Sequence, residues 1–133
     1  MIDLRDDIIL ATNARKRAHA KISMYTVGTV LMAKNGKRYV GCNIHNDGIQ
    51  SICAERVAFV KAISEGETEF EQIVVVGAPK GEKADVECVP CGYCRQFMHE
   101  YVKEDFKIFT IDKEKVRQYS IKDLLPYGFK FEE

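Results

Sequence analysis

Hydrophobic residues recur along this chain with two different periods, which divide it into predicted helices and strands. Between residues 2 and 18, apolar side chains stand at helical spacing among many charges, and this predicts an amphipathic helix with one face toward a core. Residues 27–33 and 38–44 are typical of strands, and Asn35-Gly36 between them is a strong hairpin-turn signal. The chain therefore begins with a helix followed by a hairpin.

After the hairpin, helices alternate with strands. Residues 53–64 predict a helix ended by Gly66, because glycine readily takes the left-handed conformation after a helix. The continuous apolar run 73–78 predicts a strand buried on both faces, and Pro90 stands where the next helix should begin. A further strand and a short helix are expected at residues 107–111 and 121–125. This order favours an α/β fold, a three-layer α/β/α domain over residues 1–133 with a mixed sheet of about five strands.

Composition excludes several classes of function. Lysine plus arginine balances aspartate plus glutamate, 20 against 20, so net charge gives no reason to expect nucleic acid or an anionic membrane as the main partner. No apolar run approaches the length of a membrane span. Residues 1–7 lack the basic-then-apolar order of a signal peptide, so a cytoplasmic location is expected. Five cysteines, an odd number, favour metal-binding or catalytic thiols over a disulfide framework.

Two short motifs carry the candidate chemistry. Residues 53–55 read Cys-Ala-Glu, and residues 90–94 read Pro-Cys-Gly-Tyr-Cys. Zinc takes four ligands, and three thiolates with one position left for water make a catalytic arrangement. Zinc lowers the pKa of that water toward neutrality, and Glu55 would then carry the proton. This combination is the signature of zinc deaminases that act on cytosine or adenine rings.

The predicted helix starts suit these thiols. Cys91 and Cys94 lie three residues apart, so they share one face of a helix, and Cys53 would open a separate helix. A helix N-terminus favours thiolate over thiol. Three thiolates on a dication leave one net negative charge, and Arg56 is placed to offset it by hydrogen bonding to a thiolate.

Other interpretations of these residues stay open at this point. A structural zinc site would need a fourth protein ligand, which Cys88 or His99 could supply. A thioredoxin-like redox pair would use the second motif alone and leave the first motif without a purpose. Cys42 and Cys88 are otherwise expected to be structural or incidental, because a cysteine on a strand is usually a small buried hydrophobe.

From about residue 22 to residue 129 the chain resembles the small, homotetrameric type of cytidine deaminase. Cys-Ala-Glu-Arg at 53–56 and Pro-Cys-Gly-Tyr-Cys-Arg-Gln at 90–96 carry the resemblance. It implies that Glu55 shuttles protons between water, the ring nitrogen and the leaving ammonia. It also implies a bound Zn²⁺ ion and a small nucleoside substrate. The implied zinc ligands are Cys53, Cys91 and Cys94.

The resemblance also implies a substrate pocket. The backbone around Ala54 would line the base pocket, Asn43 would bind the ribose, and Tyr25 stands where relatives usually have phenylalanine. Phe129 resembles a C-terminal aromatic residue that, in relatives, packs over the site of a neighbouring subunit. A homo-oligomer, a tetramer by resemblance, is therefore expected.

One departure concerns the sugar. Relatives carry Asn-x-Glu on the ribose-binding strand, where this chain reads Asn43-Ile44-His45. Residues 43 and 45 point the same way along a strand, but an imidazole has different preferred partners from a carboxylate. Blasticidin-S deaminases likewise lack the Asn-x-Glu pattern.

The expected function is hydrolytic deamination of cytidine or deoxycytidine in pyrimidine salvage, giving the uracil nucleoside and ammonia. The alternatives are deamination of a modified cytosine nucleoside such as blasticidin S and, from another class, a catalytically silent zinc-binding domain. Editing of nucleic acid is disfavoured, since no basic stripe is present.

Overall fold

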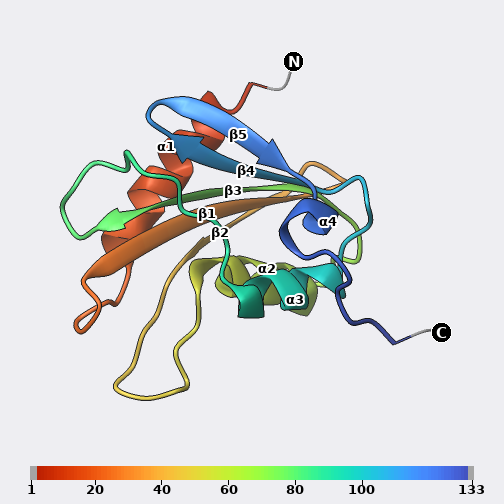
Figure 1. The fold of residues 1–133 in the computed structure, drawn as a ribbon, viewed down its shortest axis with the longest axis horizontal. Helices are drawn as coiled ribbons and strands as arrows, with labels where there is room; N and C mark the ends of the chain where they lie inside the picture. The colour runs from red at the N-terminus through yellow and green to blue at the C-terminus, as the bar shows by residue number, and fades with distance from the viewer. Residues whose placement is uncertain (1–2, 132–133) are drawn as a thin grey trace.

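A single mixed sheet carries helices on both faces in the computed structural model, which describes residues 3–131 (Figure 1). Its five strands lie in the order β2-β1-β3-β4-β5. The strands are β1 (Tyr25–Ala33), β2 (Arg38–Cys42), β3 (Phe70–Pro79), β4 (Lys107–Asp112) and β5 (Lys115–Tyr119). The helices are α1 (Arg5–Ala14), α2 (Ala54–Ser64), α3 (Gly92–His99) and α4 (Ile121–Leu124). The predicted α/β/α architecture is confirmed.

The strand directions make the sheet mixed. β1 pairs antiparallel with both β2 and β3, β3 pairs parallel with β4, and β4 pairs antiparallel with β5. The parallel pair needs a crossover connection, which the loop after β3 and helix α3 provide. β3 lies at the centre and is buried along almost its whole length, as its continuous apolar sequence predicts.

Two hydrophobic clusters lie on opposite faces of the sheet. Neighbouring residues of β1 point to different faces, so Val30 joins the cluster beneath α1 and Leu31 joins the larger cluster beneath α2 and α3. In the larger cluster Phe59 of α2 packs its ring 5.1 Å from the ring of Phe70 at the start of β3. Phe59 also packs its ring 6.2 Å from that of Phe97 of α3. The two helices thus lie side by side on one face, and both begin near the same place (Figure 1).

The helical and turn predictions are mostly confirmed. The predicted helix 2–18 is observed as α1 and a 3-10 turn at Arg15–Arg17, and residue 2 lies outside the described residues. Gly66 follows α2 with a φ of +99°, and Gly36 has a φ of +87° in the hairpin turn. Among residues 3–131, none of the helices combines the length and apolar character needed to cross a membrane.

Two predicted boundaries are corrected by the structure, and one strand was not predicted. The strand predicted at 38–44 ends at Cys42, and Ile44 instead forms isolated bridges with His19 and Ile52. The helix after Pro90 ends at His99, so Tyr101 and Val102 lie beyond it. The edge strand β5 was not predicted, because its exposed sequence Lys-Val-Arg-Gln-Tyr shows little apolar character. The turn before β5 also gave no sequence signal. Its two positive-φ positions are occupied by Lys113 and Glu114, where hairpin turns usually have asparagine or glycine.

Candidate metal and catalytic site

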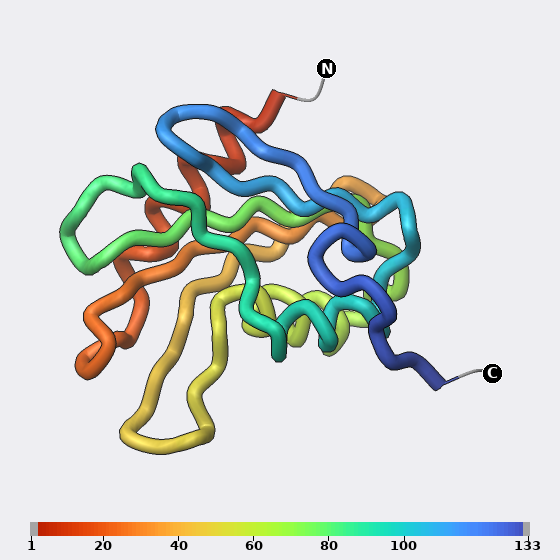
Figure 2. The backbone as a smooth tube through the Cα atoms, in the orientation of Figure 1, coloured from red at the N-terminus to blue at the C-terminus, as the bar shows by residue number. Residues whose placement is uncertain are grey.

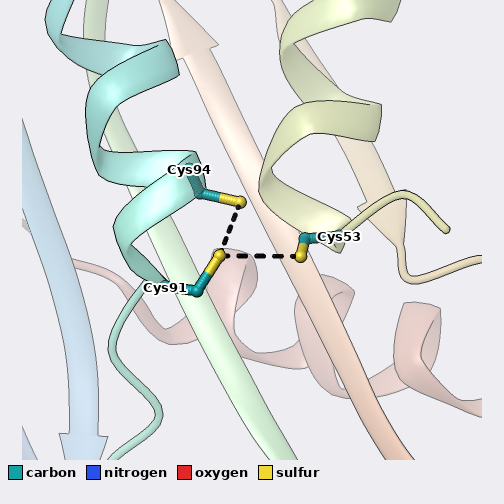
Figure 3. Close-up of side chains that lie close together, drawn as sticks. All are labelled: Cys53, Cys91 and Cys94. Carbon is teal, nitrogen blue, oxygen red and sulfur yellow. Dashed lines mark hydrogen bonds between the residues drawn. The ribbon is translucent and has the colours of Figure 1, made fainter. Parts of the chain in front are cut away.

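The starts of α2 and α3 bring three thiols together. Cys53 is the N-cap residue of α2, Cys91 is the N-cap residue of α3, and Cys94 lies in the first turn of α3. Their sulfur atoms point toward one another across the gap between the two helices (Figure 3). Residues 38 positions apart in the chain thus meet because both helices pack on the same face of the sheet.

The distances between the sulfur atoms suit zinc. Cys53 Sγ lies 3.8 Å from Cys91 Sγ, which lies 3.5 Å from Cys94 Sγ, and all three atoms lie within 4.8 Å of one another. A tetrahedral zinc ion with Zn–S bonds of about 2.3 Å holds its sulfur ligands about 3.8 Å apart. A disulfide would need about 2.0 Å, and all three thiols are free. The donor set and its spacing therefore fit zinc.

Neighbouring groups favour a thiolate at Cys53. A hydrogen bond from the Cys94 thiol, supported by the Arg56 guanidinium, lowers the pKa of Cys53 to about 5. The same bond raises the pKa of Cys94, because that thiol is the donor. Arg56 Nη2 lies 3.9 Å from Cys53 Sγ, and its guanidinium stacks 4.3 Å from the centroid of the Tyr93 ring. Arg56 thus places positive charge beside the thiol cluster.

Glu55 lies buried in the first turn of α2, directly after Cys53 and Ala54. Only 4% of the residue is exposed. Burial penalises the charged carboxylate and raises the pKa of Glu55 to about 7, from an ordinary value of 4.5. A carboxyl group with this pKa can both accept and donate a proton near neutral pH.

The suggested fourth protein ligands do not join the three thiols. Among the described residues, one group of side chains is close enough to bind a metal ion jointly. It consists of the three thiols and includes neither Cys88 nor His99. His99 is the last residue of α3, about 12 Å along the helix from Cys91 at its start. Burial raises the pKa of Cys88 to about 11, so its thiol is neutral. Cys42 is also outside the three-thiol group. Three protein ligands would leave the fourth position of a tetrahedral zinc ion open to water.

Cys88 packs with Tyr25 against the sheet. A Cβ added to Gly77 of β3 would lie 2.7 Å from Cys88 Sγ and 3.0 Å from the Tyr25 ring, so the glycine makes room for both. Burial, with the nearby Cys88 thiol, raises the pKa of Tyr25 to about 12. Tyr25 therefore presents a neutral, half-buried phenol at the start of β1.

Asn43 lies buried just beyond β2 and holds this segment to β1. Its Oδ1 accepts a hydrogen bond from the Val27 N–H (2.8 Å), and its Nδ2 donates to the Tyr25 carbonyl (2.9 Å). Both the oxygen and the nitrogen of its amide thus make hydrogen bonds inside the chain. Oδ1 keeps one lone pair for a ligand.

His45 is half-buried and bridges two polar side chains. Its Nε2 lies 3.4 Å from Asn43 Nδ2, and its Nδ1 lies 3.3 Å from Ser23 Oγ. Because the Asn43 amide nitrogen can only donate, His45 Nε2 must accept, which leaves the proton on Nδ1 to be donated to Ser23. The contacts with Asn43 and Ser23 therefore require a neutral imidazole.

Phe129 lies in the C-terminal segment, which leaves the domain near the C-terminal end of α3 (Figure 2). Its carbonyl accepts a hydrogen bond from Gln96 Nε2 at 2.7 Å, and its ring packs 5.0 Å from that of Phe131. The Phe129 residue is 62% exposed. Within this single chain, the ring is thus left open to a neighbour.

Two supporting contacts around the site had no role in the sequence analysis. Arg95 Nε donates to the Pro90 carbonyl at 2.6 Å, and its Nη1 donates to the Leu124 carbonyl at 2.9 Å. Arg95 thereby ties the loop before Cys91 to the end of α4. Glu87 accepts hydrogen bonds from the hydroxyls of Thr110 and Tyr119, which anchors the loop that leads to α3. Charged residues beside a metal motif are the sequence signal that could have indicated such anchors.

Comparisons with known proteins agree with this site. Residues 5–110 match the family described as the cytidine and deoxycytidylate deaminase zinc-binding region. A cytidine deaminase of Sporosarcina psychrophila is 33% identical over 134 residues, covering 99% of this chain and 95% of that protein. The crystal structure of a cytidine deaminase from Burkholderia pseudomallei superposes with a TM-score of 0.85 at 36% identity, covering 96% of this chain and 100% of that one.

A blasticidin-S deaminase of Bacillus cereus is also similar, at 30% identity over 77% of this chain and 76% of that protein. The family match spans most of the chain, and it includes both cysteine motifs. The chain belongs to the cytidine and deoxycytidylate deaminase family of zinc-dependent hydrolases.

Proposed function

We propose that this protein deaminates cytidine or deoxycytidine hydrolytically, giving the uracil nucleoside and ammonia. The observation that carries the proposal is the pairing of three thiols at zinc-ligand spacing with a buried carboxyl group whose pKa is raised to about 7. The first supplies a metal site with a place for water, and the second supplies a proton carrier beside it. The comparisons with cytidine deaminases support the same reaction.

The three thiols and Arg56 would form the metal centre. Cys53, Cys91 and Cys94 would hold zinc. When bound, zinc acts as a Lewis acid and lowers the pKa of water, so that hydroxide is available near neutral pH. Arg56, 3.9 Å from Cys53 Sγ, would offset the net negative charge of three thiolates.

Glu55 would move the protons. Its carboxylate oxygen takes a proton from the attacking water and gives it to the ring nitrogen beside the reacting carbon. It then takes the second proton from the hydroxyl group now bonded to that carbon and gives it to the amino group, which leaves as ammonia while the carbonyl forms. With a pKa of about 7, the Glu55 carboxyl group is present both with and without its proton at neutral pH, so it can accept a proton and pass it on. Because Glu55 is 4% exposed, bulk water has little access to the carboxylate.

The remaining residues would bind the nucleoside. We assign the base to the backbone around Ala54 and the ring of Tyr25, and the sugar to Asn43 and His45. Asn43 would use the free lone pair of Oδ1, and His45 would change its contacts with Ser23 or Asn43 to meet a hydroxyl. Phe129 would complete the site of a neighbouring subunit.

A second candidate substrate is a modified cytosine nucleoside of the blasticidin-S type. His45 favours it, because an imidazole replaces the carboxylate that would grip a ribose hydroxyl. The Bacillus cereus relative also supports it. The catalytically silent zinc-binding domain is disfavoured, since such a domain has no need of a buried glutamate with a raised pKa.

Exposed aromatic residues support a homo-oligomer. Tyr127, Phe129 and Phe131 are 103%, 62% and 78% exposed, and large exposed apolar groups close together mark interaction surfaces. We propose that this oligomer is a homotetramer and works in the cytoplasm in pyrimidine salvage, with no nucleic acid or membrane as partner.

An ammonia-release assay tests the proposed function. The purified zinc-loaded protein is offered cytidine, deoxycytidine, cytosine, CMP and blasticidin S in parallel, with zinc content measured on the same sample. We expect cytidine or deoxycytidine to be deaminated. Preference for blasticidin S would support the second candidate, and release of no ammonia from any compound by zinc-loaded protein would support the silent domain.

A further inference from the structure

The first turn of α2 rests directly on the sheet, at a point where two neighbouring strands carry a threonine and a glycine. Thr29 of β1 and Gly41 of β2 are partners across the antiparallel pair. Thr29 is fully buried, and its Oγ1 donates to the Ala54 carbonyl at 3.0 Å. The same oxygen lies 3.4 Å from the Gly41 carbonyl. One hydroxyl group therefore links the helix start to both strands.

Gly41 lets the backbone of α2 come this close. A Cβ at this position would lie 2.5 Å from the Ala54 carbonyl oxygen and 2.9 Å from the Ala58 nitrogen. Contacts below 3.0 Å to backbone atoms force something to move. At Gly41 the backbone of α2 therefore lies directly against the backbone of β2. Thr29 can hold the first turn of α2 at this place on the sheet, through the hydrogen bond from its hydroxyl group to the Ala54 carbonyl.

This contact between α2 and the sheet is made by Ala54, which stands between the two functional residues of the first motif. Ala54 separates Cys53 from Glu55, so a shift of its carbonyl moves the thiol and the carboxyl group together. The partners of these groups, Cys91 and Cys94, belong to α3, so a shift of α2 relative to α3 changes their distances from Cys53 and Glu55. A small displacement of α2 thus opens the thiol cluster and misaligns Glu55.

We propose that Thr29 is a positioning residue for the reaction. Its hydroxyl fixes the first turn of α2 and so sets Cys53 and Glu55 against the two thiols of α3. This inference rests on the proposed function of Glu55 and the thiols. A misplacement of about 1 Å can cost an enzyme about 100-fold in rate.

The test compares Thr29→Val, which keeps the shape but removes the hydroxyl, with Thr29→Ser, which keeps the hydroxyl. Thr26→Val is the matched control, because Thr26 is also buried on β1 and its hydroxyl donates to the Ala78 carbonyl at 3.2 Å, away from α2. For each zinc-loaded variant we measure kcat, KM, Tm and the rate at which a chelator removes zinc.

We expect Thr29→Val to lower kcat at least about tenfold, to leave KM within about twofold, and to speed zinc loss by about tenfold. Thr29→Ser should restore both kcat and zinc retention. Thr26→Val should lower Tm while kcat and zinc loss stay close to the wild-type values. If Thr29→Val lowers Tm alone, like the control, Thr29 has only a structural role and the inference is wrong.

Gly41→Ala provides a second test if Thr29→Val does not fold. The added methyl group pushes on the Ala54 carbonyl, so we expect the same loss of kcat and of zinc retention. Unchanged values in Gly41→Ala would overturn the inference. Glu55→Gln separates the two proposals: an active Glu55→Gln variant contradicts the proposed function, whereas an inactive one beside a fully active Thr29→Val contradicts the positioning role alone.

Discussion

At the scale of single residues, Glu55 is the group whose loss should damage the chemistry most. Glu55→Gln keeps the size of the side chain but cannot accept a proton. General acid–base catalysis contributes about 10²–10⁴-fold, so we expect kcat to fall by at least about that much while zinc stays bound. Steady-state kinetics with metal analysis on one sample measures both. Near-normal turnover would mean that another residue carries the protons.

The raised pKa of Glu55 also predicts how stability depends on pH. Its pKa rises from 4.5 to about 7 on folding because burial disfavours the charge, so the folded protein holds this proton more tightly than the unfolded chain. Between pH 4.5 and 7 the unfolded chain binds fewer protons at this position, and stability must fall as pH rises. Ionisation of Glu55 thus destabilises metal-free protein above this range.

Thermal unfolding of metal-free protein measures the effect. Glu55→Gln resembles the protonated form at every pH and serves as the reference. We expect the Tm of the wild type, relative to that of Glu55→Gln, to be lower at pH 8 than at pH 5. A Tm difference that stays constant over this range would show that Glu55 ionises at its ordinary pKa.

His45 is the residue at which substrate choice is expected to be decided. A carboxylate would accept a hydrogen bond from a ribose hydroxyl more strongly than a neutral imidazole, and such charge-assisted bonds contribute about 1.5–3 kcal/mol. His45→Glu should therefore raise kcat/KM for cytidine by about tenfold or more, mainly through KM, because zinc and Glu55 are untouched.

Kinetics of the wild type and His45→Glu are compared on cytidine, deoxycytidine and blasticidin S. Substrates that offer a hydrogen-bond acceptor or an anionic group at this position should be handled less well by the variant. Identical preference in the two proteins would show that His45 does not contact the sugar. His45 would then be left with its contacts to Ser23 and Asn43 alone.

Sequence reasoning reached some of these residues and missed others for a physical reason. Cys91, Cys94 and Glu55 belong to short motifs whose spacing already determines which side chains share a helix turn. Thr29 and Gly41 carry no local signal, because their role comes from a contact with α2 that exists only once the sheet and helix have packed. Tertiary contacts of this kind are invisible to a reading of neighbouring residues.

At the scale of elements, the metal site joins the starts of α2 and α3. Changing Cys53, Cys91 or Cys94 to alanine should abolish the one zinc per chain that we expect, because two ligands hold zinc poorly. Cys42→Ala and Cys88→Ala are the matched controls and should keep the metal. Elemental analysis of the five variants decides between these outcomes. Full zinc in Cys53→Ala, or zinc lost from Cys88→Ala, would contradict the assignment.

The elements themselves were predictable where burial imposes a pattern. β3 lies at the centre of the sheet, so both of its faces demanded apolar residues and produced a continuous run. β5 lies at the edge and is mostly exposed, so packing imposed no such pattern. The short helix α4 was recognisable, and the structure adds its reason: Ser120 and Asp123 form a reciprocal capping box.

At the scale of the whole molecule, the exposed C-terminal aromatic residues favour the proposal that a neighbouring subunit completes the site. Phe129 is 62% exposed, and its segment lies near the end of α3 farther from Cys91 (Figure 2). If Phe129 covers the site of a neighbour, Phe129→Ala should raise KM for the nucleoside with zinc retained. Phe131→Ala, in the same segment, is the control for general loss of apolar surface and should affect KM less.

Mixing subunits tests whether the site is shared between chains. A Glu55→Gln subunit has an intact Phe129 but no proton carrier, and a Phe129→Ala subunit has the reverse. When the two are dissociated and reassembled together, some sites combine an intact Glu55 with an intact Phe129 from the neighbour. At low nucleoside concentration we expect the mixture to exceed the summed activity of the two separate proteins, with light scattering showing an oligomer. Activity equal to that sum, or a monomeric protein, would mean that each chain completes its own site.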